Sequence, residues 1–168
     1  KANVSIKLTQ IGMGLDEETC RQNLVRILEQ ARKHVNFVRV DIEDTPYTDV
    51  TILIYKAMLE RGFTTRQVGM AAQSYLYRAE ADVRSLLEIG TRFRLVKGAY
   101  MEPADKAYPK KADTDANYDL LTKILIDGAL KIESNTLSDD GRIPPIPAIA
   151  SHDDKRIEFA KKHAEKVG

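Results

Sequence analysis

Residues 37–44 read FVRVDIED, a stretch in which apolar and charged side chains alternate. Because successive side chains of a strand point to opposite faces, the two valines and the isoleucine share one face. The other face carries Arg39, Asp41 and Glu43. The stretches before and after have the spacing of apolar residues that is typical of amphipathic helices. A strand between two helices predicts a βαβ unit, the repeating element of a parallel sheet.

The same alternation of short β-type runs and helical stretches continues along the chain. It predicts an α/β fold, a (β/α)8 TIM-type barrel of which this chain covers about five βα units. The expected strands are Val4–Leu8, Phe37–Ile42, Val68–Gln73, Phe93–Lys97 and Ile146–Ala150. The expected helices run from an N-cap at Asp16 to about Lys33, from an N-cap at Thr45 followed by Pro46 to about Arg61, from about Ala81 to Ile89, from Asp115 to Ile132, and from Asp154 to Lys166.

Two stretches lack regular periodicity. Residues 101–113 form a polar loop, and residues 134–147 contain Asp139, Asp140, Gly141 and three prolines. The second stretch is longer than the roughly two to six residues that usually join a helix to a strand. We therefore expect a surface insertion at residues 134–147.

The overall composition excludes several classes of partner. The sequence has 26 basic and 25 acidic residues and a formal net charge of +1, so nothing in the totals favours nucleic acid. The single cysteine, Cys20, cannot form an internal disulfide, and no Cys and His residues have the spacing of a zinc site. No apolar run approaches the roughly 20 residues of a membrane span. We expect a small-molecule ligand.

Charged side chains on an inward-facing strand row require an explanation, since barrel interiors are ordinarily filled by branched apolar residues. Burying an unpaired charge costs several kcal/mol. One interpretation is a structural ion-pair network of Lys7, Arg39, Asp41 and Glu43. The other is an active site, because barrel enzymes place their catalytic groups at the carboxyl ends of the strands. The polar strand-end residues that would converge on it are Lys7, Asp41, Gln73, Arg94, Lys97 and His152.

Five segments resemble, in the same order, the flavin-dependent proline dehydrogenase family. They are VSIKLTQIG from Val4, FVRVDIED from Phe37, AAQSYLYR from Ala71, RLVKGAY from Arg94 and AIASHDD from Ala148. The most specific is RLVKGAY, because two cations, a glycine and a tyrosine at a strand end are hard to obtain as generic packing. The resemblance covers most of the chain. It fits either the monofunctional bacterial type or the proline dehydrogenase domain of a bifunctional enzyme.

The resemblance implies oxidation of L-proline to 1-pyrroline-5-carboxylate, the first step of proline degradation to glutamate, with FAD bound in the barrel mouth. Arg94 and Asp41 match the family's catalytic residues, and Lys7 matches the lysine that pairs with the substrate carboxylate. Arg94 would stabilise negative charge on the reduced flavin. The matched cofactor-binding residues are Ile42, Gln73, Lys97, Gly98, Ala99, Ser151 and His152, and no metal is implied.

The resemblance also implies an electron acceptor, either quinone or the respiratory chain. The expected location is the cytoplasm or the periphery of the inner membrane, mitochondrial in a eukaryote. The family barrel has elements upstream of Lys1 and a further strand and helix after the His-containing strand. We therefore expect residues 1–168 to be a partial β/α-barrel catalytic domain that lacks these N-terminal and C-terminal elements.

Three other functions stay open at this point. Lys7 or Lys97 could form a Schiff base with a carbonyl substrate, as in an aldolase-like barrel. Asp41, Glu43 and His152 could hold a divalent metal ion, because two carboxylates and an imidazole are suitable ligands. The chain could also be a non-catalytic barrel fragment or scaffold.

Overall fold

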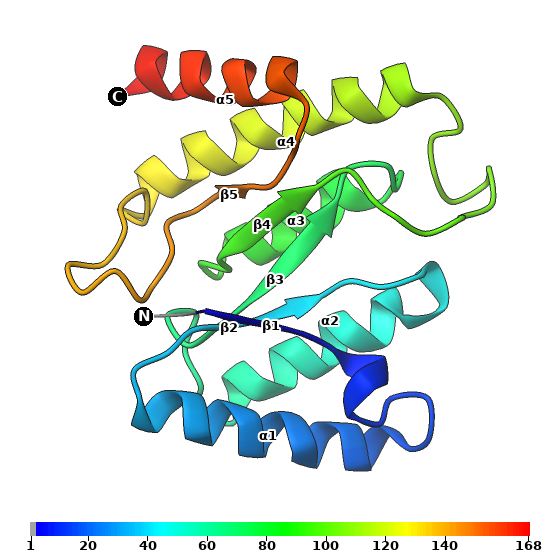
Figure 1. Ribbon diagram of the computed structural model, residues 1–168, viewed down its shortest axis with the longest axis vertical. Helices are drawn as coiled ribbons and strands as arrows, with labels where there is room; N and C mark the ends of the chain where they lie inside the picture. Colours follow the sequence, from blue (N-terminus) through cyan, green and yellow to red (C-terminus); the bar gives the residue numbers. More distant parts are fainter. Residues whose placement is uncertain (1–2) are drawn as a thin grey trace.

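The computed structural model describes residues 3–168, and its five strands alternate with helices along the chain (Figure 1). Each strand pairs in parallel with the next, so the order across the sheet equals the order in the sequence. The predicted α/β fold with a parallel sheet is confirmed. The elements are β1 (Val4–Lys7), a 3-10 helix η1 (Leu8–Ile11), α1 (Glu17–Lys33), β2 (Val38–Asp41), α2 (Thr45–Glu60), β3 (Val68–Gln73), α3 (Ala79–Leu87), β4 (Phe93–Val96), α4 (Lys111–Lys131), β5 (Ala148–Ile149) and α5 (Asp154–Val167).

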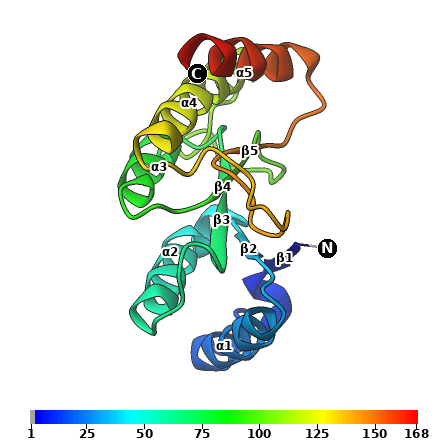
Figure 2. The same ribbon diagram turned by 90° about the vertical axis from the view of Figure 1, so that its left-hand side faces the viewer.

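The hydrophobic core lies between the sheet and the helices. Figure 2 shows the strands inside an arc of helices, with α1 and α5 at the two ends of the arc. Val40, Met70 and Leu95 of the central strands are fully buried in one cluster with Leu28 of α1 and Tyr118 of α4. The alternate residues of the same strands face the concave side. They include the polar residues Asp41, Gln73 and Arg94, called the polar row below. No helix in the described part of the chain is long and apolar enough to cross a membrane.

The structure corrects two predicted boundaries next to the polar row. β1 ends at Lys7, and Leu8 already belongs to η1. Thr9 is therefore not on the strand. The N-cap of α2 is Asp44, which has extended backbone angles, and Thr45 is the first helical residue; the free Thr45 N–H is bound by a carboxylate from outside the helix.

Three further boundaries differ from the prediction. The helix α3 runs over Ala79–Leu87, two residues earlier than expected, because Arg78 already accepts the first helical hydrogen bond from Asp82. The helix α4 starts at Lys111, one turn before the expected residue, so the polar loop after β4 is shorter than residues 101–113. The last strand, β5, has two residues where five were predicted.

The segment 134–147 is not a plain surface insertion, and this prediction is wrong for its second half. Ile143 and Ile146 are buried. The Arg92 guanidinium donates to the carbonyl of Pro144, with an Nη1 to O distance of 2.5 Å. Arg142 donates to the carbonyl of His34, just after α1, at 2.9 Å. The segment thus links the start of β4 to the end of α1.

Close packing at Gly69 generates a stability prediction. An ideal Cβ on Gly69 would lie 2.3 Å from the Arg92 carbonyl oxygen and 2.6 Å from Cζ of Phe37. Because overpacking a strand core costs about 1–3 kcal/mol, we expect Gly69→Ala to lower the free energy of unfolding by that amount in urea denaturation. Gly14→Ala is the matched control, since nothing lies within 4 Å of its added Cβ. Equal losses in the two variants would contradict the packing argument.

Candidate active site

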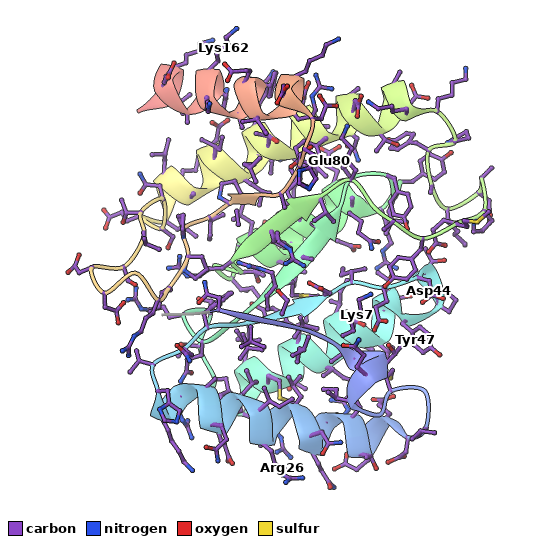
Figure 3. All side chains as sticks on the ribbon, viewed as in Figure 1. Lys7, Arg26, Asp44, Tyr47, Glu80 and Lys162 are labelled. Atoms are coloured by element: carbon purple, nitrogen blue, oxygen red, sulfur yellow. The ribbon has the colours of Figure 1, made fainter. Side chains whose placement is uncertain are left out.

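A cavity of about 420 Å³ opens at the carboxyl ends of β1 to β4, within the size range of small-ligand pockets. Figure 3 places Lys7 at this end of the sheet, where Asp44 marks the start of α2, whereas Arg26 and Lys162 point away from the outer helices. The lining residues are Lys7, Asp41, Ile42, Ala71, Gln73, Arg94, Val96, Lys97, Gly98, Ala99 and Tyr100. The structure therefore brings together all the predicted site residues except Ser151 and His152.

An ion pair between Arg94 and Asp41 crosses the floor of the cavity. Arg94 Nη2 donates to Asp41 Oδ1 at 2.5 Å, and Arg94 Nη1 donates to Ser5 Oγ at 3.0 Å. Arg94 is the second residue of β4 and lies level with Ala71 of β3, so it is not at the strand end as predicted. Its long side chain reaches β2 over β3, where the small Ala71 leaves room. The pair is only partly exposed, 28% for the Arg94 side chain and 18% for that of Asp41.

The first of the two interpretations, a structural ion-pair network of Lys7, Arg39, Asp41 and Glu43, is not what the structure shows, because Asp41 pairs with Arg94 instead. Glu43 is buried, and its carboxylate accepts from the Thr9 N–H at 3.0 Å and from the Thr9 hydroxyl at 2.6 Å. Arg39 lies over the Phe37 ring at 5.0 Å. Its Nε and Nη2 are buried and have no hydrogen-bond partner among the described residues. Burial and the nearby Arg94 charge lower the pKa of Arg39 to about 10.

Lys7 and Tyr100 lie together at the opening of the cavity. The Lys7 ammonium is 5.5 Å from the centre of the Tyr100 ring. Interaction with Tyr100, followed by the charges of Glu43 and Asp41, raises the pKa of Lys7. Lys7 is thus a permanent cation at neutral pH, directed at the same space as the Arg94–Asp41 pair.

Lys97 is held by two carboxylates that the sequence prediction missed. Its Nζ lies 2.5 Å from Asp115 Oδ1 on α4 and 2.6 Å from Asp153 Oδ2 before α5. Burial opposes its charge, but the hydrogen bonds to Asp115 and Asp153 raise the pKa of Lys97 overall. The sequence placed both partners next to expected helix starts, since Asp115 was the first residue of one expected helix and Asp153 precedes Asp154; Asp153 is the N-cap of α5 and accepts from the Lys155 N–H.

Gln73 and Gly98 shape the inner wall. Gln73 Nε2 donates to the Ile42 carbonyl at 2.9 Å, while its Oε1 is buried and has no partner among the described residues. Gly98 has φ +124°, and a Cβ there would lie 2.3 Å from the Tyr75 ring. The glycine is therefore required by contact with Tyr75 as well as by its backbone conformation.

Ser151 and His152 lie outside the lining of this cavity. The Ser151 hydroxyl accepts from the Asp153 N–H at 3.0 Å, and His152 is exposed. Ser151 instead borders a separate, largely apolar hollow between α4, β5 and α5. Both residues follow β5, the strand next to β4, so they flank the site without closing it.

The geometry also bears on the alternative chemistries. Among residues 3–168, no group of three or more His, Cys, Asp or Glu side chains is placed to hold a metal ion. A lysine that forms a Schiff base needs a lowered pKa, so that the neutral amine is available. The pKa values of Lys7 and Lys97 are both raised. The site is suited to binding anions and orienting a ligand.

The proline dehydrogenase family model matches residues 1–168. The chain belongs to the proline dehydrogenase family. It is 34% identical over 168 residues to proline dehydrogenase 2 of Bacillus subtilis, covering 99% of this chain and 49% of that protein. It is 36% identical over 165 residues to a proline dehydrogenase of Deinococcus radiodurans, covering 96% and 48%. The chain thus spans about half the length of the curated relatives it matches.

Solved structures of the family share the fold. The chain superposes on proline utilization A from Bdellovibrio bacteriovorus, inactivated by N-propargylglycine, with a TM-score of 0.80 and 27% identity. This match covers 98% of this chain and 18% of that one. A mutant of proline utilization A from Bradyrhizobium japonicum gives a TM-score of 0.76 at 21% identity. The TIM-type barrel architecture predicted for this proline dehydrogenase family member is therefore confirmed.

The Lys97 cluster predicts a dependence of stability on pH. The hydrogen bond from Lys97 lowers the pKa of Asp153 well below its usual range. A lowered pKa stabilises the folded state above the unfolded value of roughly 3.9, and this contribution is lost as the pH falls below it. Asp153→Asn keeps a good N-cap but removes the charge. We expect the difference in unfolding free energy from wild type to be constant above about pH 5 and to shrink between roughly pH 4 and 2.

The measurement is urea denaturation across this pH range. Lys97→Met provides the matched background, because it removes the largest cause of the shift. In that background the Asp153→Asn effect should depend less on pH. An unchanged pH dependence would show that Lys97 does not cause the lowered pKa of Asp153.

Proposed function

We propose that the protein containing this chain is an FAD-dependent proline dehydrogenase that oxidises L-proline to 1-pyrroline-5-carboxylate. The observation that carries the proposal is the gathering of Lys7, the Asp41–Arg94 pair and Gln73 in one cavity, in a chain of this family. Because the chain spans about half the length of its curated relatives, we assign the activity to the whole protein. Residues 1–168 are on this view a partial barrel domain that supplies one side of the site.

The donor and acceptor atoms around the cavity fit a flavin. Gln73 Oε1 and Arg94 Nε are buried without hydrogen-bond partners among the described residues, and polar atoms in such positions usually have one. Ile42, Lys97, Gly98 and Ala99 line the same cavity. We assign these residues to the cofactor, with Ser151 and His152 at its border. A bound flavin supplies the hydride acceptor that no amino-acid side chain can provide.

The remaining groups fit an amino-acid substrate. Lys7 offers a cation to the carboxylate of L-proline. Asp41 offers a carboxylate to the ring nitrogen, and its contact with Arg94 fixes its position. Arg94 also places a fixed positive charge beside the region where electrons are transferred, which favours a reduced, anionic acceptor. The protein's part in the reaction is thus binding, orientation and electrostatic stabilisation.

We further infer that the electrons pass to quinone or the respiratory chain. A protein that acts in this way works in the cytoplasm or at the periphery of the inner membrane, mitochondrial in a eukaryote. The support for this inference is membership of the family. No helix among the described residues could span a membrane.

The central test uses the whole protein. Under anaerobic conditions, L-proline should bleach the visible flavin absorption. Lys7→Met should raise the KM for L-proline by roughly tenfold or more, since an ion pair to the substrate is lost, while the flavin content stays unchanged. Steady-state kinetics and the absorption spectrum of the purified variants measure the two effects.

The matched control is Lys56→Met, an exposed lysine on α2 away from the cavity, which should leave KM unchanged. A protein that binds flavin but does not bleach with L-proline would refute the substrate. If Lys7→Met lost flavin while keeping its KM, the roles given to Lys7 and the cofactor residues would be reversed.

A further inference from the structure

One short segment after β2, residues 42–45, is tied to three of the other strand ends. The Ile42 carbonyl accepts from Gln73 at the end of β3. Glu43 binds the N–H and hydroxyl of Thr9, just after β1. Thr45 is bound in turn from the loop after β4. The 42–45 segment therefore fixes the positions of the chain segments that follow β1, β3 and β4 relative to one another.

The tie from the loop after β4 is made by Glu102. Its Oε1 accepts from the Thr45 N–H at 2.7 Å, and its Oε2 accepts from the Thr45 hydroxyl at 2.5 Å. The arrangement repeats the Glu43–Thr9 link, with one carboxylate gripping both donors of one threonine. Thr45 opens α2, so the carboxylate also meets the positive end of the helix dipole. Figure 1 shows the loop after β4 reaching toward the start of α2.

Glu102 lies two residues after Tyr100, in the turn that borders the cavity. The Glu102 N–H donates to the Tyr100 carbonyl at 3.1 Å, which closes the turn. On the other side, Gly98 rests against the Tyr75 ring. The turn carrying Tyr100 is thus fixed at one end by Tyr75 and at the other by Glu102. Tyr100 in turn lies beside the Lys7 ammonium.

We propose that Glu102 is a positioning residue of the active site, which holds Tyr100 against Lys7 by fastening the turn after β4 to the start of α2. Glu102 does not line the cavity, so it acts through Tyr100 and not by contact with a ligand. This inference rests on the proposed function, since the property that it sets is the binding of L-proline at Lys7.

The link is tested in the whole protein with the variants Glu102→Ala, Glu102→Gln and Thr45→Val. Losing a charge-assisted hydrogen bond corresponds to roughly a tenfold change or more, so Glu102→Ala should raise the KM for L-proline by about that factor. The kcat should change less. Glu102→Gln should recover part of the loss, because its amide oxygen still accepts from the Thr45 N–H. Glu60→Ala, an exposed glutamate at the far end of α2, is the matched control.

A double-mutant cycle separates positioning from a general loss of stability. If the two residues act through one contact, Glu102→Ala with Thr45→Val should raise KM no more than Glu102→Ala alone. Limited trypsin digestion gives a readout that needs no activity. Lys106 is exposed in the same loop, and its cleavage should become faster in Glu102→Ala than in Glu60→Ala.

The outcomes separate the two proposals. A wild-type protein that does not oxidise L-proline sinks the proposed function. An active wild type whose Glu102 variants keep the wild-type KM overturns the inference, even if Lys106 is cleaved faster, because Glu102 then only stabilises the loop. Additive effects of Glu102→Ala and Thr45→Val also overturn it. A raised KM, partial rescue by Glu102→Gln and non-additivity together support it.

Discussion

The contact between Arg94 and Asp41 is the interaction on which the geometry of the cavity depends. It joins β4 to β2 across β3, so it requires a small side chain at Ala71 and a parallel register that places Arg94 level with it. Both charges are largely shielded from water, and an unpaired charge in such a place would cost several kcal/mol. The pair can therefore form only if β2 and β4 keep their present positions on either side of β3.

A second group of ion pairs stabilises the part of the cavity wall that contains Lys97. Lys97 follows β4, and its ammonium is divided between Asp115 on α4 and Asp153 before α5. Arg156 of α5 also contacts Asp119 on α4 at 2.9 Å. The outer helices are thus joined to the strand end through a cation that also borders the cavity. The packing of α4 against α5 and the shape of the cavity near Lys97 therefore depend on the same group of ion pairs.

The alternation within FVRVDIED predicted a strand, and the helical stretches on both sides of it predicted the parallel sheet, because both periodicities are local properties of the chain. The positions of Lys7, Asp41 and Gln73 at the ends of predicted strands also placed them correctly at the cavity. Which charges pair could not be read from spacing. Arg94 and Asp41 are 53 residues apart, and Glu102 and Thr45 are 57 apart. Helix ends were missed by a few residues, and the contact that Glu102 makes with Thr45 at the start of α2 could not be read from the local sequence.

The Arg94–Asp41 contact also bears on how the two residues would divide their roles. The proposed function gives Asp41 to the substrate and Arg94 to the flavin, as if the two could be altered separately. Since Arg94 Nη2 and Asp41 Oδ1 share one hydrogen bond, removing either side chain leaves the other as an uncompensated, partly buried charge. Loss of one residue must disturb the surroundings of the other, so on the proposed function substrate binding and the electrostatics of electron transfer would be coupled through this pair.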